Sequence, residues 1–328
     1  MKNFRRKISA FLAFLAVLSV PAAADVPAAP TENSVPAETS SQPSEQTDSS
    51  TKKSGGDDAL DALISSREHD AQVAALREVL ARRDALFAEA ETLPENEFLR
   101  RAADIAERFS ALCSRFPDSV AALYFYAEFL RDGGESESAE ALLLKAEKIE
   151  SEFAPAQFLL AEIYAARGEA EKAFPRFAAA VYAEPGRAHW RGIFGEFLVA
   201  SRDRLLAAKC FESRAELDAK MQSEFLVASA LEPENFDALW RYAESFYDAE
   251  APDWSRALVA WDRVARKIPS ARRDALVPAV RLHRARALVE LGKFEEADTI
   301  LRETAGVPGL EHSRRKVFEI LVEKRKKR

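Results

Sequence analysis

The stretch that decides the fold is residues 154–187, APAQFLLAEIYAARGEAEKAFPRFAAAVYAEPGR. It shares its pattern with the preceding segment, 120–153, VAALYFYAEFLRDGGESESAEALLLKAEKIESEF. Self-similarity at a fixed period of this length is the sequence signature of repeat architectures. Small residues recur in register in both segments: Ala127 with Ala161, Gly134 with Gly168, Ala139 with Ala173, and Ala146 with Ala180. We therefore predict that each segment forms a helix, a short turn at glycine and a second helix.

This pattern resembles the tetratricopeptide repeat, in which positions 8, 20 and 27 are small, position 15 is usually glycine and position 32 is proline. The matches in residues 154–187 fall at positions 7, 8, 11, 15, 20, 24, 27 and 32: Leu160, Ala161, Tyr164, Gly168, Ala173, Phe177, Ala180 and Pro185. The resemblance implies an all-α fold, a right-handed α-solenoid of helix-turn-helix repeats. It also implies that the chain binds other proteins.

Three later segments carry looser matches. Residues 188–219 keep four positions, although Arg202 replaces the turn glycine: Gly195, Leu198, Ala207 and Phe211. Residues 236–269 keep seven, if two residues are inserted near Pro252: Tyr242, Ala243, Phe246, Ala257, Trp261, Val264 and Pro269. Residues 278–309 keep five: Ala285, Leu288, Gly292, Ala297 and Leu301. The stretch 220–235 is out of phase, and we interpret it as an extra helix or an overlong second helix before Pro233.

Two helices are expected before the array. Apolar residues recur at helical spacing in residues 58–92 (Val73, Leu76, Leu80 and Phe87) and in residues 95–116 (Phe98, Ile105, Phe109 and Leu112). The first leaves a coiled coil open, and the second, ending at Pro117, is interpreted as the relic of a first repeat. The predicted organisation is thus a signal peptide (1–24), a disordered Ser/Thr/Pro-rich linker (25–56), an N-terminal helical segment (57–117), the repeat array (118–308) and a C-terminal capping helix with a basic tail (309–328).

The N-terminus has the features of an export signal. Four cations, Lys2, Arg5, Arg6 and Lys7, precede an apolar run at 8–20 and three alanines at 22–24. We predict cleavage after Ala24 and a periplasmic or extracytoplasmic location. The apolar run is short for a membrane span. An uncleaved N-terminal anchor stays open as the alternative, because a flexible linker suits a chain that is tethered at one end.

Catalytic and metal-binding patterns are absent from the sequence. The chain has no Gly-rich phosphate loop, no G-x-S-x-G, H-E-x-x-H or C-x-x-C motif, and only two cysteines, Cys113 and Cys210. We predict two buried thiols on apolar stripes, no enzymatic activity, no metal and no cofactor. His189, beside Trp190, has two interpretations: a residue lining a site, or a structural histidine at a helix start.

The resemblance implies a concave groove lined by positions 2, 5, 9, 12 and 13 of each first helix, which share one face at helical periodicity. Position 9 reads Glu128, Glu162, Glu196, Glu244 and Arg286. Position 5 reads Tyr124, Phe158, Gly192, Trp240 and Leu282, and position 12 adds Arg131 and Tyr247. The predicted partner-binding residues are Tyr124, Glu128, Phe158, Glu162, Glu196, Trp240, Glu244, Tyr247 and Arg286. This acidic, aromatic-lined groove favours a partner with basic and apolar side chains.

Charge is unevenly distributed along the chain. The net charge is −7, and removing the four cations of the predicted signal peptide leaves −11. Residues 312–328 carry eight Lys or Arg and two Glu, or +6, so residues 25–311 carry −17. The basic tail has two interpretations: contact with anionic lipid or an envelope polymer, or complementation of a helix C-terminus. Nucleic-acid binding is not expected for an exported acidic chain.

We therefore predict a non-enzymatic interaction scaffold or adaptor in the cell envelope that captures a peptide or helix in its groove. The alternative is a self-assembling structural protein that forms homo-oligomers through its N-terminal helix.

Overall fold

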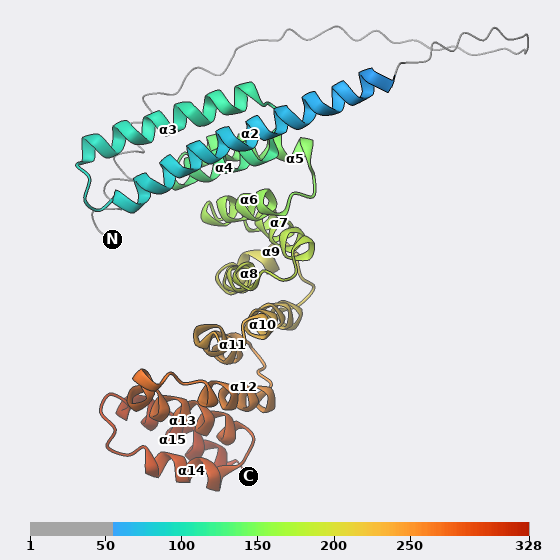
Figure 1. Ribbon diagram of the computed structural model, residues 1–328. Coiled ribbons are helices and arrows are strands. Elements are labelled where there is room, and N and C mark those ends of the chain that lie inside the picture. The colour runs from blue at the N-terminus through green and yellow to red at the C-terminus, as the bar shows by residue number, and fades with distance from the viewer. Residues whose placement is uncertain (1–54, 328) are drawn as a thin grey trace, which may run out of the picture. The chain divides into compact units, whose positions relative to one another are not determined.

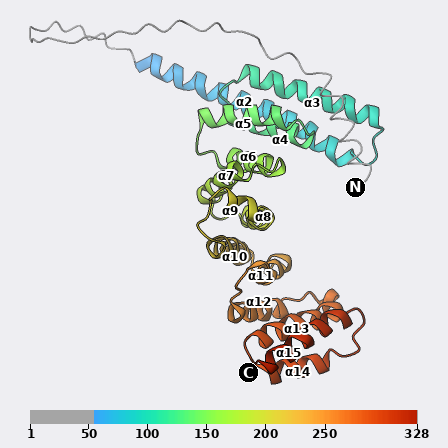
Figure 2. The same cartoon turned by 180° about the vertical axis from the view of Figure 1, so that it is seen from behind.

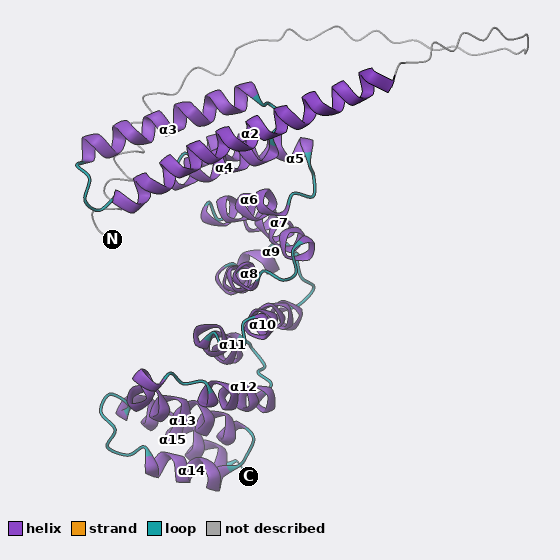
Figure 3. Ribbon diagram, viewed as in Figure 1, coloured by secondary structure: helices purple, strands orange, loops and turns teal. Residues whose placement is uncertain are grey.

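The computed structural model describes residues 55–327, with side chains from His69 onward. The predicted signal peptide, its cleavage site and nearly all of the linker lie outside the described residues. All regular elements of residues 55–327 are helices, with no strand among them (Figure 3). The predicted all-α solenoid of helix-turn-helix repeats is confirmed. No helix of the described part is long and apolar enough to cross a membrane.

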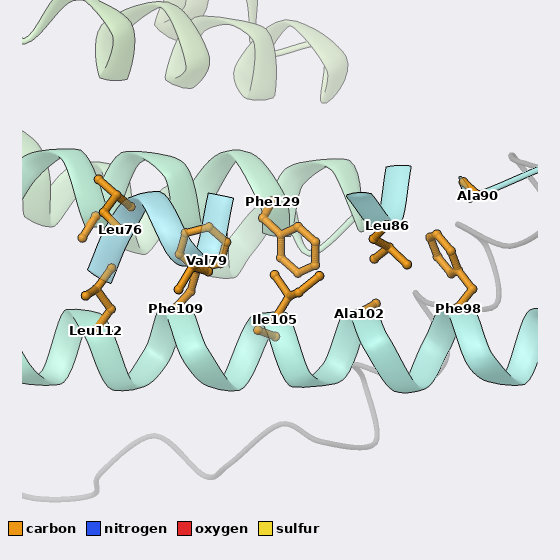
Figure 4. Packing of buried hydrophobic residues seen from close by; sticks show 12 residues of the cluster. Leu76, Val79, Leu86, Ala90, Phe98, Ala102, Ile105, Phe109, Leu112 and Phe129 are labelled. Carbon is orange, nitrogen blue, oxygen red and sulfur yellow. The ribbon is translucent and has the colours of Figure 1, made fainter. Parts of the chain in front are cut away.

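Residues 55–149 form the first of two compact units. Its helices are α2 (Gly55–Glu89), α3 (Glu95–Arg115), α4 (Val120–Asp132) and α5 (Ser136–Ile149). Helices α2 and α3 run antiparallel (Figure 1), and α4 and α5 form the helix pair predicted within residues 120–153. Figure 4 shows the core that joins α2, α3 and α4. The predicted stripe of α3 is confirmed, because all four of its members are buried: Phe98, Ile105, Phe109 and Leu112.

The apolar stripe of α2 differs from the prediction. Leu76 is buried as expected, but its buried neighbours are Val79 and Leu86, while Val73 and Leu80 are only half-buried. The reason is that α2 packs against α3 and also reaches α4, where the ring of Phe87 lies 6.2 Å from that of Phe129. Part of the stripe that left a coiled coil open is therefore used within the chain.

Residues 150–327 form the second unit, seen from both sides in Figures 1 and 2. Its helices are α6 (Ala154–Ala166), α7 (Ala170–Ala183), α8 (Ala188–Ala200), α9 (Arg202–Ala207), α10 (Arg214–Leu231), α11 (Phe236–Asp248), α12 (Trp254–Arg266), α13 (Arg273–Glu290), α14 (Phe294–Glu303) and α15 (Glu311–Lys326), with a 3₁₀ turn at Ser270–Arg272. Successive antiparallel pairs bury small and aromatic residues between them, and α15 packs on α13 and α14 through Val317 and Leu321.

The predicted turn glycines have the conformation that the repeat requires. Gly134, Gly168 and Gly292 have φ of 83°, 77° and 73°, a region that L side chains rarely adopt. At Gly168 the backbone N–H donates to the carbonyl of Ala165, and the next N–H donates to that of Tyr164. This arrangement caps the first helix and reverses the chain.

The third repeat departs from its predicted register. Ala207 and Phe211 were expected in its second helix, but Ala207 ends the short helix α9 and Phe211 lies in the loop after it. The second helix of the pair is α10, which packs against α8. The overlong second helix predicted at 220–235 thus corresponds to most of α10. Our repeat positions 20 and 24 are wrong here because α9 and its loop are inserted between the two helices.

The last two repeats agree better with the prediction. In the second repeat, α6 begins at Ala154 and α7 at Ala170. In the fourth, α11 begins at Phe236 and α12 at Trp254, so the distance between the two helix starts is longer by two residues. The two-residue insertion near Pro252 is confirmed. Helix α13 begins at Arg273, before the predicted start at 278, and Pro278 lies inside it.

The cysteines are free and half-buried. Cys113 packs against the core of the first unit, and burial raises the pKa of its thiol to about 11. Cys210 lies in the loop after α9, so its predicted place on a helical stripe is wrong.

Candidate functional site

In the first unit, the predicted groove residues Tyr124 and Glu128 lie half-buried on α4. Glu128 Oε2 forms an ion pair with Arg83 Nη1 of α2 at 2.7 Å, and Tyr124 Oη lies 3.4 Å from Glu128 Oε1. The position-9 carboxylate is therefore neutralised by the chain itself. This pairing arises because α2 packs beside this part of α4.

Phe158 on α6 is part of the core of the second unit. Its side chain is 6% exposed, stacked on Trp190 at a centroid distance of 4.6 Å and edge-on to Phe177 at 5.3 Å. A ring held between two others presents little surface to a partner, so the structure gives Phe158 a place in the core, while its predicted role as a partner-binding anchor stays a prediction. Glu162 lies one helical turn further along α6 and is half-buried.

The predicted groove positions of α8 come together in one pocket. Positions 2, 5 and 9, which are His189, Gly192 and Glu196, line a cavity of about 480 Å³ together with residues of α10 and α11. A Cβ atom built at Gly192 would meet nothing within 4 Å, so the absent side chain leaves this cavity open. His189 is exposed at the pocket wall. The structure thus favours the interpretation of His189 as a residue lining a site.

The charges around this pocket are partly compensated. Glu196 Oε2 accepts a hydrogen bond of 3.0 Å from Arg241 Nη2 of α11, and Arg241 also pairs with Asp248 at 3.0 Å. Two further carboxylates, Glu232 and Asp237, line the pocket. Among the lining residues, three carboxylates face one guanidinium, and Arg272, outside the lining, pairs with Asp237 at 3.7 Å.

Sequence reasoning missed the contribution of α10 to the pocket. Phe225, Ala228 and Glu232 line it because α10 occupies the place of the second helix. Gly195 could have indicated this packing. A Cβ atom there would lie 2.7 Å from Cε1 and Cζ of Phe225, so only glycine permits the contact.

The remaining predicted residues lie around an aromatic cluster near the C-terminus. Trp240, Trp261 and His283 form its centre, with His283 stacked on Trp261 at 4.0 Å and Trp240 edge-on to Trp261 at 5.1 Å. Tyr247 Oη and His283 Nδ1 are 3.0 Å apart. Burial lowers the pKa of His283 to about 4, so its ring is neutral at pH 7.

Two predicted charged residues lie beside this cluster. Arg286 pairs with Glu290 at 2.6 Å, and its guanidinium carbon lies 5.3 Å from the centre of the Trp254 ring. Glu244 is half-buried on α11. The pKa of the neighbouring Tyr247 is raised mainly by burial. The charge of Arg286 lowers this pKa and the charge of Glu244 raises it, both by less than burial does. The charge of the residue at position 9 thus changes from negative on α11 to positive on α13. No cluster of His, Cys, Asp or Glu suited to a metal ion occurs among the described residues.

The basic tail forms ion pairs with the chain itself. Lys324 pairs with Glu290 at 2.5 Å and Arg325 with Glu295 at 3.0 Å. Lys327 pairs with Glu323 one turn earlier at 2.6 Å. These contacts use part of the positive charge that we considered for an envelope partner.

A family model and solved structures of other proteins match this chain. A family model for the tetratricopeptide repeat matches residues 154–173 and 278–303. No curated protein matches the sequence. Among solved structures, YrrB, described as a TPR protein with an unusual peptide-binding site, matches with 15% identity and a TM-score of 0.50, covering 65% of this chain and 99% of its own.

Two further solved structures match less closely. PilF of Pseudomonas aeruginosa has 19% identity and a TM-score of 0.37 over 62% of this chain and 88% of its own. A tetratricopeptide repeat protein of Parabacteroides merdae has 12% identity and a TM-score of 0.31 over 75% and 99%. The fold defines the class as an all-α repeat solenoid. The two segments that match the family model support a tetratricopeptide repeat protein, and such proteins are typically scaffolds that bind protein or peptide partners.

Proposed function

We propose that this chain is an interaction scaffold that binds a basic, apolar peptide or helix of a partner protein in the pocket between α8, α10 and α11. The observation that carries the proposal is the convergence of groove positions 2, 5 and 9 of α8 on one open cavity of about 480 Å³. A cavity of this size holds a few side chains of a peptide.

The pocket combines apolar and acidic groups. Ile193, Phe225 and Ala228 supply apolar surface, and Glu196, Glu232 and Asp237 supply carboxylates. Lysine or arginine of a partner would find these carboxylates at the rim, while its apolar side chains would be buried against α10. Like-signed carboxylates in a concavity also accelerate the association of a cationic partner.

The sharpest test of the pocket uses Gly192. Because nothing lies within 4 Å of a Cβ built there, Gly192→Trp would fill the cavity without a clash at its first side-chain atom. Gly186, in the turn before α8, is equally open, so Gly186→Trp is a matched control. Selection from a random peptide library should enrich sequences rich in Lys or Arg and apolar residues. They should bind the wild type and Gly186→Trp but not Gly192→Trp.

Enrichment without a preference for basic residues would contradict the proposed charge selection. Equal binding by the Gly192→Trp variant would place the site elsewhere on the chain. Charge reversal at Glu196 is a poorer test, since it would also break the ion pair with Arg241.

The proposal includes export to the cell envelope. Its support is the sequence alone: the cations at residues 2–7, the apolar run at 8–20 and the alanines before Asp25. Intact-mass analysis of the protein from its native host should give a chain that begins at Asp25. A mass that retains Met1 would contradict cleavage and favour an N-terminal anchor.

A further inference from the structure

A second cavity in unit 2 is chemically unlike the first. It has a volume of about 420 Å³ and lies between α13 and α15, beside the C-terminal end of α11. One wall comes from positions 279, 282, 283 and 286 of α13, and the facing wall from 313, 316, 317 and 320 of α15. Both sets follow the i, i+3, i+4, i+7 spacing of a single helix face. The cavity shares no lining residue with the pocket at α8.

The interior of this cavity is apolar. Leu282, Leu310, Val317 and Ile320 line it together with Ala279. Two of its five polar side chains are occupied with each other, since Tyr247 Oη and His283 Nδ1 form a hydrogen bond of 3.0 Å. A buried peptide backbone would find few partners for its N–H and C=O groups, and leaving them unpaired is costly. The lining therefore suits a ligand with a hydrocarbon body.

The charge at this cavity is positive. Arg286 and Lys316 line it from opposite walls, and no carboxylate lines it. Lys316 is exposed, with no ion pair to any residue of the described chain. Arg286 shares Glu290 with Lys324, which leaves this trio with one excess positive charge. In addition, Arg286 Nη1 is buried and has no hydrogen-bond partner in the described chain.

An anionic head group would be attracted by the exposed ammonium of Lys316 and by the excess positive charge of Arg286, Lys324 and Glu290. Charge-assisted hydrogen bonds of this kind are stronger than those between neutral groups.

From these observations we infer that the cavity between α13 and α15 binds an anionic amphiphile, with its hydrocarbon chain on the apolar walls and its carboxylate at Arg286 and Lys316. The inference is independent of the pocket at α8, and Gly192→Trp should leave amphiphile binding unchanged.

Calorimetric titration of the full chain with dodecanoate, below its micelle concentration, tests the inference. We expect saturable one-to-one binding, at least tenfold tighter than binding of dodecyltrimethylammonium, which has the same chain and the opposite charge. Lys316→Glu should weaken dodecanoate binding at least tenfold. Arg315→Glu makes the same charge change one residue away, outside the cavity lining, and should change it less than threefold.

Ala279→Trp adds a test that does not depend on charge. It should abolish dodecanoate binding by filling the cavity, while circular dichroism and thermal unfolding confirm that the variant folds. Equal affinity for the two amphiphiles, or equal effects of Lys316→Glu and Arg315→Glu, would overturn the inference. Unchanged binding by the Ala279→Trp variant would also overturn it.

Discussion

The second and third repeats bury their helix pairs in the same way but reach that packing by different routes. In the second, α6 begins at Ala154 and α7 at Ala170. In the third, α8 begins at Ala188 but α10 begins only at Arg214, because α9 and its loop lie between them. In both repeats the second helix packs closely on the first. The comparison shows that two helices can keep their packing when the segment that connects them changes. The condition is that a small residue of one helix faces a large residue of the other, as Gly195 of α8 faces Phe225 of α10.

The turns of the two repeats show the same principle. At Gly168 the chain leaves α6 with φ of 77°, and at Lys209 it leaves α9 with φ of 58°. The hydrogen bonds match, because Lys209 N donates to Leu206 O and Cys210 N donates to Leu205 O, as the corresponding groups do after α6. The third repeat therefore reverses its chain at a lysine, well after Arg202, the position at which the repeat pattern placed the turn.

The third repeat also contains buried ion pairs. Glu224, with a side chain 2% exposed, pairs with Arg191 at 2.8 Å and with Lys220 at 2.7 Å. Asp218 accepts hydrogen bonds of 2.8 Å from Arg214 Nε and from the backbone N–H of Glu250, which joins α10 to the end of α11. These contacts hold α10 in place after the inserted segment.

The largest expected effect comes from removing a buried charge of the third repeat. Glu224→Ala should lower the free energy of unfolding by about 3–5 kcal/mol, because Arg191 is left as a largely buried cation without its partner. Glu171→Ala, at an exposed site of the second repeat, should change it by less than about 0.5 kcal/mol. Urea unfolding of both variants measures the difference, and equal effects would show that the ion pairs do not hold α10.

In the fifth repeat, a buried histidine makes the free energy of unfolding depend on pH. Burial lowers the pKa of His283 to about 4, below its ordinary value of 6.5, so the unfolded state binds the proton more tightly. The contribution of neutral His283 is therefore complete above pH 6.5 and is lost as the pH falls toward 4, up to about 3 kcal/mol. Unfolding of the wild type and of His283→Gln between pH 7 and 4 should show a shallower decline for the variant. Parallel profiles would contradict the assignment.

Two glycines of α8 are expected to respond with opposite signs. Gly195→Ala should destabilise the chain by about 1–3 kcal/mol, because the new Cβ would lie 2.7 Å from the ring of Phe225. Gly192→Ala should stabilise it by about 0.5–1 kcal/mol, since alanine favours the helix and meets no neighbour. Thermal unfolding measures both. Stabilisation by Gly195→Ala would mean that α10 does not pack on α8 in this way.

A further expected effect concerns the two turns. Lys209→Gly should stabilise the chain by about 1 kcal/mol, because glycine adopts positive φ without the steric penalty that lysine suffers there. The reciprocal change Gly168→Ala should destabilise it by a similar amount. Chemical denaturation of the two single variants compares the turns directly. A destabilised Lys209→Gly variant would contradict the shared geometry.

The regular repeats could be predicted from the sequence, because their small residues and turn glycines lie in one register. Helices α4–α7 form the two predicted helix pairs, and each pair turns at its predicted glycine. The second helix of the third repeat could not be predicted, for two reasons. A lysine, Lys209, adopts the left-handed conformation that the pattern expects of a glycine. Phe211 is buried like a helical core residue although it lies in a loop. It is 8% exposed and packs on Phe174 at 4.9 Å.

The candidate site was predictable only in part. Helical periodicity placed His189, Gly192 and Glu196 on one face of α8, and the structure brings them into one pocket. Periodicity alone does not show whether a residue of that face meets a neighbour. Phe158 has the periodicity of a groove residue but packs in the core. The ion pairs of Glu128 and Glu196 depend on Arg83 and Arg241, which are distant in sequence.

The most direct measurement of the central claim is an affinity capture from a crosslinked envelope extract of the native host. Residues 57–328 serve as bait in three forms: wild type, Gly192→Trp and Gly186→Trp. We predict a partner that the wild type and Gly186→Trp retain and Gly192→Trp loses. A partner held equally by all three forms, or recovery of the bait alone, would contradict the assignment of the pocket between α8, α10 and α11 as the binding site.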